Sequence, residues 1–155
     1  MAPTGVATNG NGVVSCYLAP TGSPWTGGKN GVRVASVLSI GTTVTLASSA
    51  FTFNANGMEN IPKAATTATS IGALGTIPAD QWGVVVALIS AAGTITFMSG
   101  PSNYTTGYPS NEAAVAALPS IYPAAGLCFF GYFTVKTKAA TEFIFATDSL
   151  AGGAT

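Results

Sequence analysis

The sequence predicts a mainly β protein, an antiparallel β-sandwich or barrel with one short helix at about residues 110–118. Short apolar runs are separated by clusters of Gly, Pro, Asn and Ser, and β-branched residues are abundant. Several runs alternate in type, so that Ile95 and Phe97 face a core while Thr94 and Thr96 face outward. The expected strands are 13–19, 32–40, 43–47, 49–54, 83–90, 93–98, 127–137 and 141–146.

Two tight hairpins are expected among these strands. Residues 90–93 end in Gly93, which suits the left-handed position of a short loop, so strands 83–90 and 93–98 should pair antiparallel. A second hairpin at residues 138–141 should join the aromatic run 129–135 to residues 143–145. We expect the densest part of the core in these two hairpins.

The single expected helix has recognisable ends. Ser110 is a candidate N-cap, Glu112 lies in the first turn and Pro119 ends the helix. Two turns rich in alanine are marginal in isolation, so the helix should dock onto the sheet through Val115 and Leu118.

The domain organisation is predicted as a flexible arm over residues 1–12 followed by a single β domain over residues 13–155. Residues 1–12 are small, polar and rich in glycine, and they offer little apolar area to offset the entropy of ordering. They act either as a frayed terminus, which is favoured, or as an arm that orders across a neighbouring subunit. Residues 55–80 lack a clear period and suggest a turn, a short strand near Ser70 and Ile71, and a linker.

The charge content points to association with other proteins. Only 6% of the residues are charged, and five basic and five acidic side chains give a formal net charge of zero. An ordinary domain has about 25% charged residues and a net charge that keeps copies apart. Nucleic acid is not an expected partner, because phosphate binding needs clustered bases and only Lys136 and Lys138 lie together.

Neither a membrane nor a secretory route is predicted. The longest apolar run, residues 84–89, is far shorter than the ~20 residues of a spanning helix, so we interpret it as a buried strand. The first residues contain neither a basic nor an apolar signal region, which suggests folding in a cytoplasm. Cys16 and Cys128, the only cysteines, are expected to be free and buried within strands.

The usual catalytic groups are missing from the sequence. Without histidine there is no common general base and no Ser-His-Asp or Cys-His arrangement. The acidic residues have no spacing that singles out a catalytic pair: Glu59, Asp80, Glu112, Glu142 and Asp148. Residues 27–31 do not complete a phosphate-binding loop, and residues 54–59 do not complete a calcium loop. We therefore predict no enzyme activity, no catalytic or metal site and no cofactor.

Exposed aromatic rings offer one alternative, a platform on which sugar faces stack. The candidates are Trp25, Trp82, Tyr104, Tyr108 and Tyr122. The favoured interpretation is structural: Trp82 and Tyr122 cover core edges, while Tyr104 and Tyr108 cover the docked helix.

Residues 77–150 carry a family resemblance through several short segments: 77–83, 90–96, 106–108, 111–119, 131–136 and 147–150. In these segments the chain resembles small virion proteins of tailed bacteriophages that are found among head decoration, cement or head-fibre components. The segments are structural in type, so the resemblance implies a role more strongly than a site. It covers about half of the chain.

The resemblance implies a compact β fold and a small symmetric homo-oligomer, with a trimer favoured over a dimer. It further implies attachment to the major capsid protein, on the outer surface of a capsid that is assembled in the host cytoplasm. The expected function is thus that of a capsid decoration, or cement, protein. The alternative is a glycan- or receptor-binding module of a phage fibre or tail, suggested by the loop tyrosines.

Overall fold

The main sheet has five antiparallel strands in the order β1-β2-β12-β10-β11. Its strands are β1 (Gly5–Asn9), β2 (Gly12–Leu18), β10 (Trp82–Ser90), β11 (Ile95–Ser99) and β12 (Leu127–Lys136). The computed structural model describes residues 5–9, 12–18, 31–34, 38–40, 44–121 and 126–150.

Strand β10 forms the centre of the core, because both of its faces are covered. Every residue from 83 to 89 is buried, as the continuous apolar run predicts. Val84, Val86 and Leu88 face a cluster beneath the helix. The alternate residues Val85, Ala87 and Ile89 face a larger cluster on the opposite side of the sheet.

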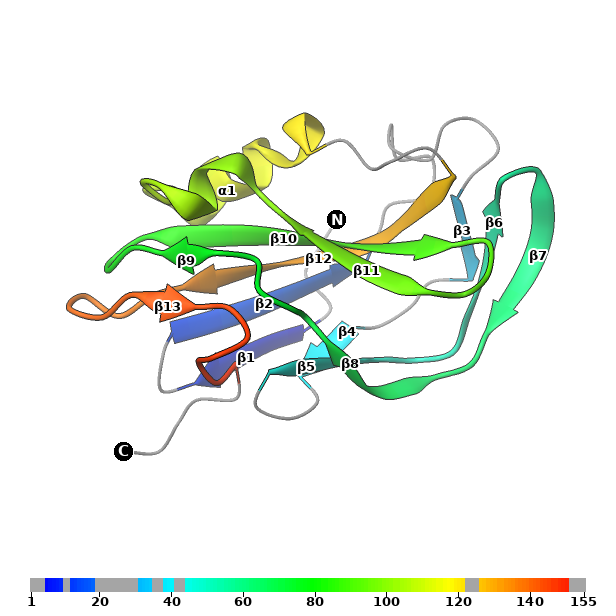
Figure 1. Cartoon of the computed structure of the whole chain (residues 1–155), viewed down its shortest axis with the longest axis horizontal. Helices are drawn as coiled ribbons and strands as arrows, with labels where there is room; N and C mark the ends of the chain where they lie inside the picture. Colours follow the sequence, from blue (N-terminus) through cyan, green and yellow to red (C-terminus); the bar gives the residue numbers. More distant parts are fainter. Residues whose placement is uncertain are drawn as a thin grey trace.

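The second layer consists of small antiparallel sheets, with orders β3-β6-β7, β4-β5-β8 and β13-β9. Their strands are β3 (Gly31–Val34), β4 (Leu38–Ile40), β5 (Thr45–Ser48), β6 (Phe51–Ala55), β7 (Met58–Lys63), β8 (Thr66–Ser70), β9 (Thr76–Ile77) and β13 (Phe143–Ile144). Apolar side chains of β4, β5 and β6 pack into the larger cluster together with those of β10 and β12. The fold is therefore mainly β and sandwich-like, which confirms the predicted class (Figure 1).

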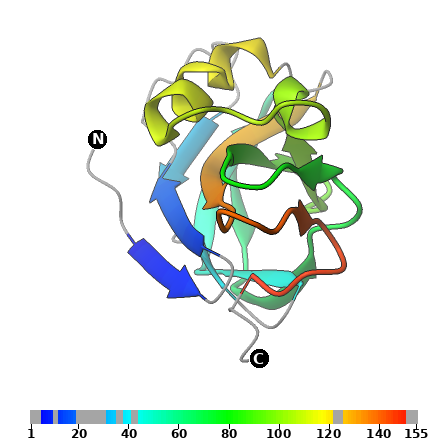
Figure 2. The same cartoon turned by 90° about the vertical axis from the view of Figure 1, so that its left-hand side faces the viewer.

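The helical layer covers the other face of the main sheet, seen at the top of Figure 2. It contains α1 (Asn111–Ala116) and the 3₁₀ helices η2 (Pro101–Tyr104) and η3 (Leu118–Ser120). The hydroxyl of Ser110 accepts a hydrogen bond of 3.1 Å from the backbone N–H of Ala113, so the predicted N-cap is confirmed. Ala114 and Leu118 are buried and dock the helix, whereas Val115 is only partly buried.

Of the two predicted hairpins, one is confirmed and one is partly wrong. Strands β10 and β11 pair antiparallel, and Gly93 has the positive φ of 82° that its position requires. Lys138 and Thr141 also form a turn, but β13 pairs with β9 and not with β12. The physical reason is that β10 and β2 already occupy both edges of β12, which leaves no edge for a following strand.

Other boundaries differ from the sequence prediction. The single strand expected at 32–40 is two strands, β3 and β4, which belong to different sheets. Residues 55–80 contain β7, β8 and β9, so this segment is richer in strands than expected. Within the segment predicted as an arm, Gly5–Asn9 pair with β2, while residues 1–4, 10 and 11 lie outside the described residues. The division at residue 12 stays a prediction.

Candidate functional site

A projecting hairpin formed by β6 and β7 is the most distinctive surface element of the described chain, at the right of Figure 1. Asn56 and Gly57 form its turn with φ angles of 54° and 81°, which are those of a type I′ hairpin. The side-chain oxygen of Asn54 accepts a hydrogen bond of 2.9 Å from the backbone N–H of Asn60. This bond and the turn fix the conformation of the hairpin tip.

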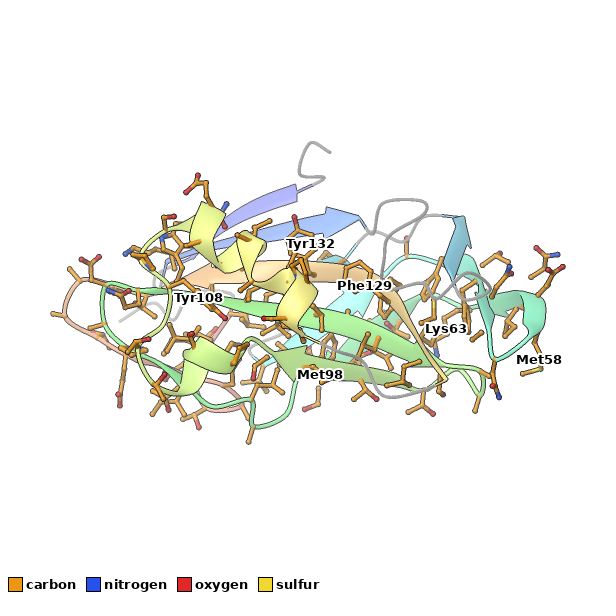
Figure 3. The ribbon with its side chains drawn as sticks, turned by 90° about the horizontal axis from the view of Figure 1, so that it is seen from above. Met58, Lys63, Met98, Tyr108, Phe129 and Tyr132 are labelled. Atoms are coloured by element: carbon orange, nitrogen blue, oxygen red, sulfur yellow. The ribbon has the colours of Figure 1, made fainter. Side chains whose placement is uncertain are left out.

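The tip carries an exposed methionine. Met58 is 51% exposed, and among the described residues only Ile144, at 37%, is a second exposed large hydrophobic side chain. Figure 3 places Met58 at one end of the molecule, far from Tyr108. A methionine side chain is flexible and polarisable, so it adapts to the surface that it meets.

An open depression of about 440 Å³ lies at the base of the same hairpin. Its lining residues are Ala50, Phe51, Thr52, Pro62, Lys63 and Ala64. Phe51 is buried and stacks on Phe130 with ring centroids 4.9 Å apart, which joins this lining to the core. The depression is lined mainly by apolar groups and suits an apolar side chain of a partner.

Lys63 supplies the only charged group of this lining, and its charge is already engaged. Its Nζ donates a hydrogen bond of 2.9 Å to the carbonyl oxygen of Gly93, in the turn between β10 and β11. The bond ties the base of the hairpin to the main sheet. The base of the hairpin is therefore fixed to the turn between β10 and β11.

The five acidic side chains of the sequence lie in different structural surroundings. Asp80 pairs with Lys136, and Asp148 accepts a hydrogen bond from the backbone N–H of Ile144 at 2.6 Å. Glu112 lies in the first turn of α1, where hydrogen bonds from its own backbone and from Ser110 lower the pKa of its carboxyl group. Glu59 and Glu142 are exposed on β7 and beside β13.

The only clustered bases of the sequence do not form a free cationic patch. Nζ of Lys136 lies 2.6 Å from the Asp80 carboxylate and also donates to the Asp80 carbonyl oxygen at 2.7 Å. Lys138 is exposed in the following turn and uses its carbonyl oxygen to bind the backbone N–H of Asp80. An ion pair between partly exposed groups contributes little stability, but here it offsets half of the local positive charge.

Of the five aromatic residues considered for sugar stacking, two are buried or partly buried, and the side chains of the other three lie outside the described residues. Tyr108 is buried and Trp82 is partly buried, and both belong to the cluster beneath the helix. Two backbone hydrogen bonds of 2.8 Å join these residues. The structural interpretation is thus confirmed for this pair. Trp25, Tyr122 and the side chain of Tyr104 lie outside the described residues.

The described cysteine lies in the core. Cys128 is free and fully buried in β12, and its burial raises the pKa of the thiol to about 11. The backbone of Cys16 lies in β2 opposite Phe133, while its side chain lies outside the described residues.

The described segments contain neither a cluster of metal-binding side chains nor a membrane-spanning helix. Within these segments no three acidic, histidine or cysteine side chains gather in a group that would hold a metal ion. No helix in the same part of the chain is long and apolar enough to span a bilayer.

The sequence prediction for residues 55–80 did not include strand β7 or the hairpin that it forms with β6, although the sequence contains a usable signal. The Asn56–Gly57 dipeptide after the expected strand 49–54 is a strong local indicator of a type I′ turn. It would have located β7 as the partner of that strand, but not the exposure of Met58, which depends on tertiary packing. In comparisons with known proteins, no family model, no curated protein and no solved structure matches this chain.

Proposed function

We propose that the chain is a non-catalytic accessory protein of a virus capsid, a homo-oligomer that attaches to the outer surface of the major capsid protein. The β6–β7 hairpin is the contact element of this proposal. The observation that carries the proposal is the exposed Met58 at the tip of this hairpin, and the apolar depression at its base supports it.

The arrangement of the hairpin supports a binding role. Its rigid type I′ turn presents Met58 without a large loss of backbone entropy when a partner binds. The depression offers a complementary feature, since an apolar side chain of the partner can enter beside Phe51.

The wider surface supports the same proposal. Residues 64–79 contain no ionisable side chain. Several of them are nevertheless exposed: Ala64, Ala65, Thr67, Ala68, Ser70 and Ala73. Such a surface gives up few hydrated charges when a neighbour covers it, so the desolvation term that opposes association is small.

Binding to purified capsid shells that lack the protein tests the proposal. Met58→Asp places a charge at the hairpin tip, and we expect it to weaken binding to the shells by about tenfold or more. Ile144→Asp is the matched control, because Ile144 is also an exposed hydrophobic residue but lies at the opposite end of the molecule (Figure 1).

Three outcomes of the shell experiment are informative. Saturable binding that Met58→Asp weakens and Ile144→Asp preserves supports the proposed contact. Equal weakening by both variants contradicts the role of the hairpin. Failure of the natural chain to bind any shell, with its fold intact by circular dichroism, overturns the proposed function.

A further inference from the structure

We propose that two copies of the chain pair along the outer edge of β11, in antiparallel orientation about a two-fold axis at Phe97. The contact would join the five-stranded main sheets of the two copies into one continuous sheet. This inference rests on the homo-oligomeric part of the proposed function and not on the capsid contact.

Strand β11, which carries the Met98 labelled in Figure 3, is an edge of the main sheet. It ends the order β1-β2-β12-β10-β11, so within the described chain only β10 pairs with it. The two strands pair residue by residue without a register shift. A regular edge of this kind can be continued by the strand of a partner.

Hydrogen bonds at the two ends of the β10–β11 ladder show which backbone groups of β11 point outward. The N–H of Gly100 donates to the carbonyl oxygen of Val84 at 2.8 Å, and the N–H of Ser90 donates to that of Thr94 at 3.0 Å. Both bonds join even-numbered residues, and the ladder between them is regular. By the alternation of an antiparallel pair, the even-numbered residues of β11 therefore bond to β10 and the odd-numbered ones direct their N–H and C=O groups to the free edge.

The outward backbone groups of Ile95 and Phe97 lack a partner in the described chain. No hydrogen bond from another described segment reaches them. Phe97 is only 7% exposed, so its polar backbone groups have little contact with water. Backbone groups at buried residues are almost always hydrogen-bonded. A second β11 would supply the partners that these groups need.

Strand β11 has none of the features that usually block an edge, which are charges, proline and bulges. Among the longer edge strands whose side chains are described, β7 has Glu59, Pro62 and Lys63, and β8 has a register shift against β5. Strand β11 consists of uncharged residues without proline. A two-fold contact places each segment near its own copy, so charges would repel, and residues 81–111 contain no acidic or basic side chain.

A two-fold axis at Phe97 gives a register in which the side chains of the two strands are compatible. Ile95 would lie opposite Ser99 of the second copy, and Thr96 would lie opposite Met98 of the second copy. Thr96 is exposed, while Ile95 and Met98 are only partly buried. The contact would therefore cover apolar area that the single chain leaves in water.

Disulfide cross-linking tests the predicted register. Thr96 and Met98 of the two copies would form a non-hydrogen-bonded pair with Cα atoms about 4.5 Å apart, within the range of a disulfide. A mixture of Thr96→Cys and Met98→Cys should therefore give at least about tenfold more covalent dimer under mild oxidation than either variant alone, in which the cysteines are only diagonal neighbours. The natural chain controls for Cys16 and Cys128. No covalent dimer, or equal amounts in all three samples, contradicts the register.

The mass in solution, measured by light scattering, gives a second and independent test. The natural chain and Thr141→Lys should have the mass of a dimer, whereas Thr96→Lys should raise the dimer dissociation constant by about tenfold or more, because two ammonium groups would lie close together across the axis. Thr141 is the matched control because it is an exposed threonine in the turn after β12. Two results overturn the inference: a trimer or monomer as the natural state, or a dimer that Thr96→Lys leaves unchanged. Shell binding that fails while the dimer forms would count against the capsid contact alone.

Discussion

The hydroxyl of Thr134 donates a hydrogen bond of 2.8 Å to the side-chain oxygen of Asn111. Thr134 lies fully buried in β12, and Asn111 is the first residue of α1. The bond therefore ties the start of the only α-helix in the described chain to a central strand of the main sheet. It complements the apolar packing of Ala114 in α1 and of Leu118 in η3 against the same sheet.

Replacing Thr134 by valine should destabilise the protein by about 1 kcal/mol, because the near-isosteric side chain fills the site but donates no hydrogen bond to Asn111. Thr134→Ser is the matched control, since it retains the hydroxyl group and removes a methyl group. Urea unfolding followed by circular dichroism measures both variants. A valine variant as stable as the natural chain would show that this hydrogen bond contributes nothing.

The surroundings of Gly100 leave no room for a larger side chain. A Cβ atom at this position would lie 2.6 Å from the Tyr108 hydroxyl oxygen and 2.8 Å from Cγ1 of Val84, while the φ angle of −63° is ordinary. We expect Gly100→Ala to cost about 1–3 kcal/mol through overpacking. The matched variant Gly72→Ala has open space around its Cβ but a φ of +75°, so it should cost only about 1–2 kcal/mol of backbone strain.

Thermal unfolding of the two glycine variants separates the two effects. A further substitution, Tyr108→Phe, removes the hydroxyl group that the new Cβ would meet. It should recover part of the stability lost in Gly100→Ala and none of that lost in Gly72→Ala. If adding Tyr108→Phe changed the stability of Gly100→Ala and of Gly72→Ala by the same amount, the steric explanation would be contradicted.

The stability of the protein should fall at high pH because of Cys128. Burial raises the pKa of this thiol to about 11, above its ordinary value of 9.0, so the folded state retains a proton that the unfolded state releases. The contribution is complete below about pH 9 and is lost as the pH rises toward 11. Cys128→Ala should remove this part of the pH dependence in urea unfolding between these values. An unchanged slope would contradict the assignment.

The carboxyl group of Glu112 should make the stability of the protein depend on pH in the acidic range. Its lowered pKa means that the folded state favours the ionised carboxylate, held by its own backbone N–H and by Ser110. This stabilisation is present above the ordinary pKa of a glutamate and disappears as the pH falls through the lowered value. The natural chain should therefore unfold less readily than Glu112→Gln at neutral pH, and the difference should vanish in acid. A difference that persists in acid would point to another cause.

Local sequence signals predicted the parts of the fold that local chemistry determines. The alternation around Ile95 and Phe97, the glycine of the 90–93 turn and the cap at Ser110 each depend on neighbouring residues, and each is confirmed. The pairing of β13 with β9 depends on which edges remain free after the sheet has formed. No local pattern contains that information, and the predicted hairpin after β12 was wrong for this reason.

The proposed contact surface was less predictable than the fold. The composition indicated an exterior suited to association, but it did not say where the apolar groups would emerge. The exposure of Met58 follows from the projection of the hairpin beyond the core. Tyr108, one of the loop aromatics considered for sugar stacking, is buried in the cluster beneath the helix, as the favoured structural interpretation expected. Burial of this kind depends on contacts between segments distant in sequence.

The copy number of the protein in purified particles tests the central claim most directly. The proposed function predicts that quantitative mass spectrometry of purified virions finds this chain at a fixed ratio to the major capsid protein, released intact when the shell is dissociated. Repetition of a modest contact at every symmetric site produces such a ratio. Particles without the protein, or with a few copies unrelated to the number of capsid subunits, would contradict the role of a capsid decoration protein.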